Sequence, residues 1–185
     1  AIANASQKEY TAVLMQGSGS FGVEATLGTA IPKQNATLLI AENGTYGERM
    51  VKMADYLNIA HVVLKVPETE PVTRELVATT LDAHPEITHF AVVHCEKTTG
   101  ILNPIETILP ELQKRNIVTI VDAMSSFGGV PIDLTALQAD YLITSSNKCI
   151  QGVPGFSIVL AKRATIETTQ YQARSLSLDL YEQYR

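Results

Sequence analysis

The chain has 185 residues, which is enough for one domain with a substantial hydrophobic core. Its formal net charge is −5, so it lacks the basic surface expected of a nucleic-acid-binding protein. No apolar run reaches the roughly 20 residues that cross a bilayer, and the first residues do not resemble a signal peptide. Cys95 and Cys149 have neither CxxC spacing nor the density of a disulfide framework, which favours reduced thiols in a cytoplasmic protein.

Seven apolar runs rich in β-branched residues recur along the chain at fairly even spacing. Most of them are near-continuous, as is typical of strands that are buried on both faces. They lie at residues 11–16, 36–41, 61–66, 88–94, 117–122, 140–145 and 156–161. The last two are separated as in a hairpin, which leaves open that one of them is antiparallel to the others.

Helical patterns lie between most of these runs, at residues 23–31, 46–58, 72–84 and 104–116. Thr73 is suited to cap the third of them. The alternation predicts an α/β fold, a three-layer sandwich with a mostly parallel seven-stranded sheet. The chain begins in a helix-like run and ends in another, "LDLYEQYR", with no stop signal, so we expect a fragment of a longer protein.

Polar and charged residues collect where the predicted strands end. In an open α/β sheet, ligands bind at the carboxyl ends of the strands. The segments that follow the first, second, fourth, fifth and sixth strands are GSGSFG, ENGTYG, HCEKTTG, AMSS after Asp122, and SSNKC. This rim is therefore the predicted location of an active site.

The segment GSGSFG has the spacing G-x-G-x-x-G, which is typical of dinucleotide-binding loops. Glu42 follows at about the distance of the acidic residue that binds a ribose hydroxyl in such folds. This interpretation leaves Asp122 and Lys148 without a role, however. A helix N-terminus flanked by Ser18 and Ser20 binds other phosphates equally well, so NAD and a phosphorylated cofactor both remain possible ligands at this point.

Asp122 and Lys148 favour the phosphorylated cofactor. They follow consecutive predicted strands, which are often neighbours in a sheet, so both can face one pocket. A lysine forms a Schiff base with an aldehyde cofactor, and a carboxylate keeps a pyridinium nitrogen protonated. Each residue alone has a simpler explanation, as a strand-end cap or a surface lysine, but together with a phosphate loop they suggest pyridoxal phosphate.

Four segments carry a family resemblance: MQGSGSFGVEA, VVHCEKTTGILNPI, VDAMSSFGGVPID and SSNKCIQGVPGFSIVLAKR. They resemble the 2-aminoethylphosphonate–pyruvate aminotransferases, which belong to the class V branch of the fold-type I pyridoxal phosphate enzymes. The resemblance implies that residues 1–185 are the cofactor-binding large domain, without the N-terminal arm and the C-terminal small domain. It also implies a cytoplasmic homodimer that converts 2-aminoethylphosphonate and pyruvate to phosphonoacetaldehyde and L-alanine.

Other activities remain open. An alanine–glyoxylate or serine–pyruvate aminotransferase uses the same cofactor and belongs to the same branch. An inactive, truncated cofactor-binding domain is a further alternative. Cysteine desulfurases share the fold, but we expect histidine before their lysine, where this chain has Asn147.

The resemblance assigns roles residue by residue. Lys148 matches the lysine that forms the Schiff base and moves the catalytic proton, and Asp122 matches the partner of the pyridine nitrogen. The other cofactor contacts that it implies are Ser18, Gly19, Ser20, Ser145 and Asn147 around the phosphate, and Tyr46 and Met124 on the two faces of the ring.

One position departs from the family pattern. Lys97 stands where a hydroxyl residue contacts the phenolic oxygen of the cofactor, so either Thr98 takes over that contact or Lys97 makes it directly. We interpret His94 and Cys95 as structural, and Arg49 as a solvated or subunit-facing residue. No metal site is expected, because no two candidate ligands have a suitable spacing.

Overall fold

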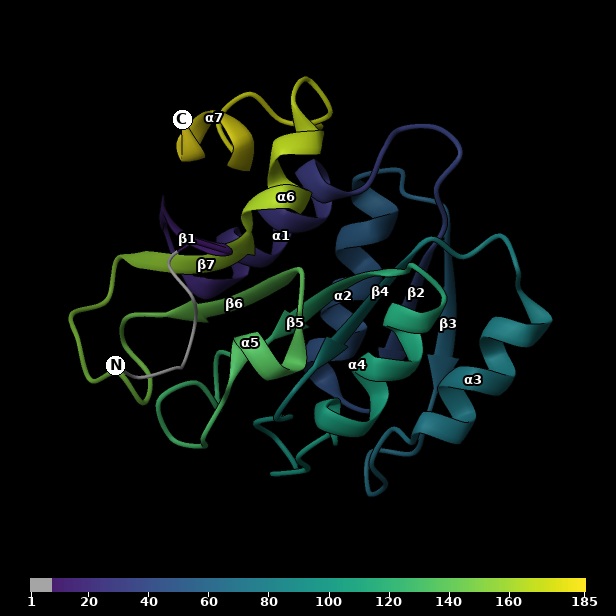
Figure 1. Cartoon of the computed structure of the whole chain (residues 1–185). Helices are drawn as coiled ribbons and strands as arrows, with labels where there is room; N and C mark the ends of the chain where they lie inside the picture. Colours follow the sequence, from purple (N-terminus) through teal and green to yellow (C-terminus); the bar gives the residue numbers. More distant parts are fainter. Residues whose placement is uncertain (1–7) are drawn as a thin grey trace.

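One seven-stranded sheet in the order β1-β7-β6-β5-β4-β2-β3 organises the chain. The computed structural model describes residues 8–185, so the helix expected at the start of the chain lies outside the described residues. Helices cover both faces of the sheet, which confirms the predicted three-layer α/β fold (Figure 1). No helix in residues 8–185 is long and apolar enough to span a membrane.

All seven predicted strands form. They are β1 (Tyr10–Gln16), β2 (Leu38–Glu42), β3 (His61–Lys65), β4 (His89–Val93), β5 (Val118–Asp122), β6 (Tyr141–Ser145) and β7 (Phe156–Lys162). The pairs β2–β3, β2–β4, β4–β5 and β5–β6 are parallel. Strand β7 is antiparallel to β6, because the connection 146–155 is too short for the crossover that a parallel neighbour needs. Strand β7 is also antiparallel to β1.

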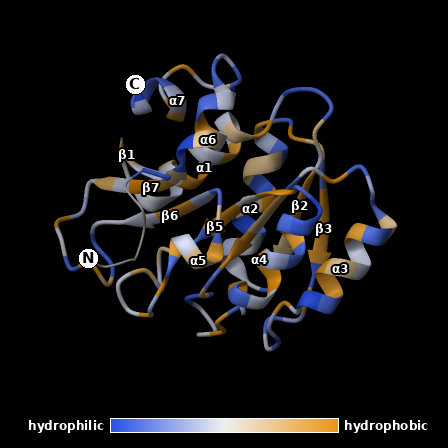
Figure 2. Cartoon of the chain, viewed as in Figure 1, coloured by the Kyte–Doolittle hydropathy of each residue, from blue (hydrophilic) through white to orange (hydrophobic). Residues whose placement is uncertain are grey.

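Each face of the sheet has its own layer of helices and its own apolar core. One layer holds α3 (Arg74–Ala83), α4 (Ile105–Lys114) and α5 (Leu134–Leu137). The other holds α1 (Gly19–Ala30), α2 (Thr45–Tyr56), α6 (Arg163–Ile166) and α7 (Leu180–Tyr184), with the 3₁₀ helix Glu167–Thr169 after α6. In Figure 2 the central strands are mostly hydrophobic and the helices carry hydrophilic segments. Helices α5 and α6 and the 3₁₀ helix are too short to show periodicity in the sequence, whereas α7 confirms the helix-like run predicted at LDLYEQYR.

Several helix boundaries differ from the predicted ones. Helices α2 and α4 end earlier, because Asn58 (φ 52°) and Asn116 (φ 55°) adopt the left-handed conformation that terminates helices. Helix α1 begins already at Gly19, inside the glycine-rich segment, whose low helix propensity hides its first turn. Thr73 caps α3 as predicted, since its Oγ1 accepts a hydrogen bond from the N–H of Leu76 at 3.2 Å.

Gly22 lets α1 lie directly on the sheet. A Cβ atom at this position would lie 2.7 Å from Oγ of Ser157 and 3.1 Å from Cγ2 of Ile143. We expect Gly22→Ala to lower the free energy of unfolding by about 1–3 kcal/mol, because the helix must move away from its packed neighbours. Urea unfolding of the two proteins measures the difference.

Gly28, in the same helix, provides the matched control. A Cβ atom there has its nearest neighbours at 3.8 Å, so Gly28→Ala creates no overlap. Alanine is the better helix former, and we expect this variant to be at least as stable as the wild type. Equal losses of stability in both variants would contradict the close approach at Gly22.

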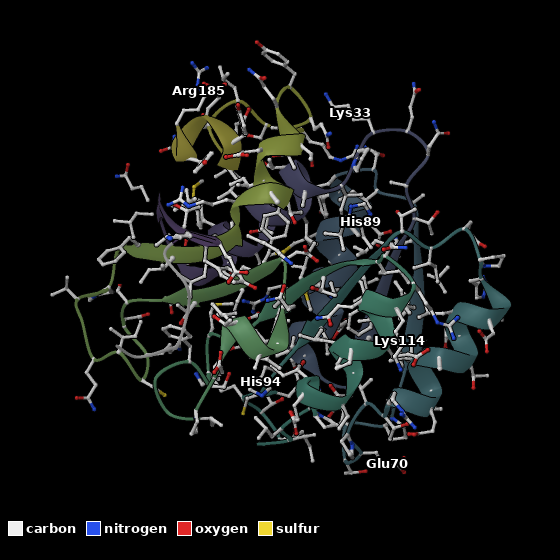
Figure 3. All side chains as sticks on the ribbon, viewed as in Figure 1. Lys33, Glu70, His89, His94, Lys114 and Arg185 are labelled. Atoms are coloured by element: carbon white, nitrogen blue, oxygen red, sulfur yellow. The ribbon has the colours of Figure 1, made fainter. Side chains whose placement is uncertain are left out.

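All strands of the described sheet except β7 run in the same direction, so their carboxyl ends meet at one edge of the sheet. Figure 3 shows His89 and His94 at opposite ends of β4, with His94 at the carboxyl end. At this edge the loops before α1 and α2 and those after β4, β5 and β6 come together.

Candidate active site

A pocket of about 240 Å³ opens at the carboxyl edge of the sheet. Among the described residues, its lining includes every predicted site residue except Thr98. The lining residues are Ser18, Gly19, Ser20, Tyr46, Arg49, Val93, Cys95, Asp122, Met124, Ser125, Ser145, Asn147 and Lys148.

Asp122, the last residue of β5, places a buried carboxylate in this pocket. Its backbone carbonyl accepts a hydrogen bond from the N–H of His94 at 2.8 Å, and its Oδ1 accepts one from the N–H of Met124 at 3.0 Å. Burial raises the pKa of the carboxyl group to about 7, and the negative charge of Glu96 raises this pKa as well. The hydrogen bond from Met124 and the positive charge of Arg49 lower it. A buried carboxylate of this kind is stabilised by a cation placed beside it, such as a protonated ring nitrogen.

Lys148 presents its amine from the turn that follows β6. The hydroxyl of Ser146 holds the turn in place, because it donates to the carbonyls of Val153 and of Phe156, the latter at 3.2 Å. Since β5 and β6 are parallel neighbours, Asp122 and Lys148 follow adjacent strands at the same edge. The pocket therefore combines a primary amine with a buried carboxylate.

The glycine-rich segment forms the first turn of α1 at the pocket wall. Gly17 has φ 123°, a conformation that favours glycine, and its N–H donates to the carbonyl of Gly155 at 2.8 Å. Within the described residues, the hydroxyl of Ser18 at the N-cap makes no capping hydrogen bond to α1. The hydroxyls of Ser18 and Ser20 and the first N–H groups of the helix form an arrangement suited to a phosphate.

Met124 and Tyr46 reach the pocket from the end of β5 and from the first turn of α2. A Cβ atom on Gly19 would lie 1.8 Å from Sδ of Met124, so only glycine leaves room for this methionine. An aromatic ring and a thioether are side chains that can enclose a flat heterocycle.

Arg49 also lines the pocket, although its sequence position predicts a solvated or subunit-facing residue. Its side chain is exposed, but its Nη1 donates to Oγ of Ser20 at 3.2 Å and its Cζ lies 4.9 Å from the ring centroid of Tyr46. It therefore links the aromatic ring to the serine loop. Its spacing of three residues from Tyr46, on one helix face, is the signal that could have indicated this role.

Thr98 is not among the described residues that line this pocket, and its contact with a cofactor stays a prediction. Of the residues described, Thr98 lies with Lys97 and Thr99 on an exposed turn outside the lining. The N–H of Gly100 donates to the carbonyl of Glu96 at 2.7 Å and closes this turn. Val93 and Cys95 line the pocket instead, with the period of two expected from an extended chain.

Cys95 and His94 are not suited to nucleophilic or metal chemistry. Burial, together with the negative charges of Glu96 and Cys149, raises the pKa of the Cys95 thiol, so the reactive thiolate is disfavoured. Burial lowers the pKa of His94, whose Nδ1 lies 2.9 Å from Oγ of Ser126. In residues 8–185, no group of three or more His, Cys, Asp and Glu side chains is placed to hold a metal ion.

The donor set fits pyridoxal phosphate better than a dinucleotide. An amine, a buried carboxylate, an aromatic ring and a helix N-terminus match the aldehyde, the ring nitrogen, the ring face and the phosphate of this cofactor. Glu42, the residue expected at a ribose, pairs with Lys65 at 3.4 Å and lies outside the lining among the described residues. Gly22, the last glycine of the motif, contacts β6 and β7 rather than the pocket.

Curated proteins are similar in sequence to this chain over nearly all of its length. The chain is 57% identical over 185 residues to a 2-aminoethylphosphonate–pyruvate transaminase of Lactiplantibacillus plantarum, covering 100% of the chain and 50% of that protein. It is 54% identical over 183 residues to the protein of the same name in Bacillus cereus, covering 99% of the chain and 50% of that protein. The chain thus spans about half the length of these curated relatives.

A solved structure shares the fold. The alanine–glyoxylate aminotransferase of Nostoc sp. is 29% identical with a TM-score of 0.84, over 91% of this chain and 45% of that one. Residues 3–175 match the aminotransferase class-V family. Since this match spans most of the sequence, the chain belongs to the class-V aminotransferases.

Proposed function

We propose that the protein is a pyridoxal phosphate-dependent aminotransferase that moves the amino group of 2-aminoethylphosphonate to pyruvate, giving phosphonoacetaldehyde and L-alanine. The observation that carries the proposal is the single pocket that combines Lys148, Asp122 and the serine loop at the start of α1. The names of the relatives at 57% and 54% identity support the choice of the two substrates.

The residues of the pocket have distinct roles in this reaction. The bound cofactor supplies an aldehyde that takes up the amino group and a protonated ring that withdraws electrons from the substrate Cα. The Nζ of Lys148 would take the proton from that carbon and deliver it to the aldehyde-derived carbon of the cofactor, and it would move a proton in the opposite direction when pyruvate takes up the amino group. The carboxylate of Asp122 holds the proton on the ring nitrogen. The residues that bind and orient the cofactor are Ser18, Gly19, Ser20, Ser145 and Asn147 at the phosphate, and Tyr46 and Met124 at the ring.

The proposal extends to the assembly. Residues 1–185 constitute the cofactor-binding large domain, and two copies of the protein associate. Phe21 in the first turn of α1 and Val153 in the connection between β6 and β7 support a homodimer, because their apolar side chains are 50% and 73% exposed and the Gly17–Gly155 hydrogen bond joins the two segments. The two free cysteines support a location in the cytoplasm.

The similarity to the Nostoc enzyme favours alanine–glyoxylate transamination as a second candidate activity. A panel of amino donors and acceptors distinguishes the two. We expect the highest kcat/KM with 2-aminoethylphosphonate and pyruvate, and a higher value with alanine and glyoxylate, or with serine and pyruvate, would reassign the substrates.

Borohydride trapping tests the cofactor and the lysine together. The protein, expressed from its complete reading frame, is mixed with pyridoxal phosphate, reduced and digested. We expect one modified peptide, the one that carries Lys148, because reduction fixes an aldehyde on the amine that bound it.

Two variants serve as controls for the trapping. Lys148→Arg should lose the modification, whereas Lys97→Arg, on the exposed turn nearby, should retain it. Modification scattered over surface lysines, or binding of NAD in place of pyridoxal phosphate, would reject the proposal. The same treatment of residues 1–185 alone shows whether this portion holds the cofactor by itself.

A further inference from the structure

Glu96 is a buried carboxylate to which the roles above assign no function. It is 0% exposed and lies between the pocket-lining Cys95 and the exposed turn that carries Lys97. Its Oε1 accepts a hydrogen bond from the N–H of Gly47 at 2.8 Å, and its Oε2 accepts one from the N–H of Tyr46 at 3.3 Å. The side chain thus bonds to the first turn of α2, where a negative charge is favourable.

Glu96 takes the place of the missing local cap of α2. The N-cap residue is Gly44, which has no side chain to bond to the first N–H groups. A Cβ atom at Gly44 would lie only 2.7 Å from Cδ of Glu96, so the carboxylate occupies the space where a local capping side chain would begin. The position of the first turn therefore depends on a residue from a distant part of the sequence.

The backbone of Glu96 is fixed within the loop that follows β4. Its N–H donates to the carbonyl of Ile101 at 3.0 Å, and its carbonyl accepts from Gly100 at 2.7 Å. Glu96 thereby ties the loop after β4 to the helix that carries Tyr46. Because aromatic stacking depends on the separation and orientation of the rings, a small shift of this turn would weaken contact with a cofactor.

We propose that Glu96 is a positioning residue of the cofactor site, which anchors the first turn of α2 and so holds Tyr46 against the cofactor ring. This inference rests on the proposed pyridoxal phosphate function. Among the residues described, Glu96 lies outside the pocket lining, so it acts through Tyr46 and not by touching the cofactor. Its effect on cofactor affinity must therefore disappear when the Tyr46 ring is removed.

A double-mutant cycle tests this dependence. The dissociation constant of pyridoxal phosphate is measured for the wild type, Glu96→Gln, Tyr46→Ala and the double variant, all expressed from the complete reading frame. We expect Glu96→Gln to weaken binding about tenfold, the size of one lost charge-assisted hydrogen bond, but less than about twofold when Tyr46 is alanine.

Gly44→Ala gives a second, independent route to the same result. Its φ of 165° is accessible to any residue, so the added Cβ acts by displacing the Glu96 carboxylate. In protein that keeps Tyr46, we expect Gly44→Ala to lower the affinity for pyridoxal phosphate as much as Glu96→Gln does. In the Tyr46→Ala protein, we expect Gly44→Ala to cause little further loss of affinity. If Glu96→Gln does not fold, Gly44→Ala still tests the proposal.

Asp140→Asn is the matched control for a general loss of stability. The Asp140 carboxylate accepts hydrogen bonds from the N–H of Thr119 at 2.9 Å and from Oγ1 of Thr165 at 2.6 Å, near the amino end of β5. We expect it to lower the thermal midpoint and leave the dissociation constant unchanged.

Three results would decide against the proposal. If Glu96→Gln and Gly44→Ala behave as Asp140→Asn does, the role of Glu96 is purely structural. If their effects are equal in the two Tyr46 backgrounds, they do not act through the ring. If the wild type itself binds no pyridoxal phosphate, the proposed function fails and this inference fails with it.

Discussion

Replacement of Lys148 by alanine should lower kcat for transamination by about 10⁴-fold or more, because it removes both the amine that bonds the cofactor and the group that moves the substrate proton. Steady-state assay of alanine formation measures the loss. The side chain is only partly buried, so we expect the free energy of unfolding to change by less than about 0.5 kcal/mol.

The nearby lysine on the exposed turn is the control for this prediction. Lys97→Ala should retain activity within about threefold of the wild type, since its side chain is exposed and outside the pocket lining among the described residues. Substantial activity in Lys148→Ala that disappears only when Lys97 is also replaced would show that Lys97 supplies the catalytic amine.

Asp122→Asn should lower kcat by about 10²–10³-fold, the usual effect of removing one preorganised electrostatic group. A neutral amide cannot hold the proton on the ring nitrogen, so the ring withdraws electrons from the substrate less strongly. The absorbance spectrum of the bound cofactor and the value of kcat, measured on the same preparation, report the two effects.

The same substitution should stabilise the cofactor-free protein above neutral pH. Burial raises the pKa of Asp122 from its ordinary value of 3.8 to about 7, so the folded state binds this proton more tightly than the unfolded state does. The free energy of unfolding therefore falls as the pH rises from about 4 to about 7 and then levels off. Three pKa units correspond to about 4 kcal/mol, which is the upper limit of the gain expected for Asp122→Asn at pH 8.

Urea unfolding of cofactor-free wild type and Asp122→Asn between pH 5 and pH 8 measures this gain. The stability of the variant should decline less with pH than that of the wild type. Asp140→Asn should be destabilised at every pH, because its carboxylate is hydrogen-bonded at the other end of the sheet. An Asp122→Asn protein that is no more stable than the wild type at pH 8 would contradict the electrostatic penalty.

The loss of activity and the gain in stability that we expect for Asp122→Asn have one physical cause. The Asp122 carboxylate is held at the end of a buried strand, where solvation is poor, and its charge becomes favourable when a cation lies beside it. In the proposed function, a protonated pyridine ring supplies that cation. On this proposal, Asp122 is unfavourable for the empty fold and favourable for the reaction.

Hydrophobic patterning was sufficient to predict the strands, the main helices and the edge of the sheet where the pocket lies. Short, near-continuous apolar runs rich in β-branched residues favour strands of a covered sheet, and the helical periodicities between them favour a layered α/β fold. Asp122 ends one such run and Lys148 lies in the turn just after another, so their place at the carboxyl edge follows from strand direction.

The tertiary structure alone decided what comes together from distant parts of the chain. The pairing of β1 with β7 joins the first strand of the described sequence to the last, and no local pattern specifies a partner strand. Glu96 caps a helix that lies about fifty residues before it, and Arg49 bonds to Ser20 on another helix. Thr98 lies on an exposed turn that the hydrogen bond between Gly100 and Glu96 closes, outside the pocket lining among the described residues. Hydrogen-bond partners, burial and side-chain direction depend on neighbours in space, and the periodicity of a sequence contains only neighbours along the chain.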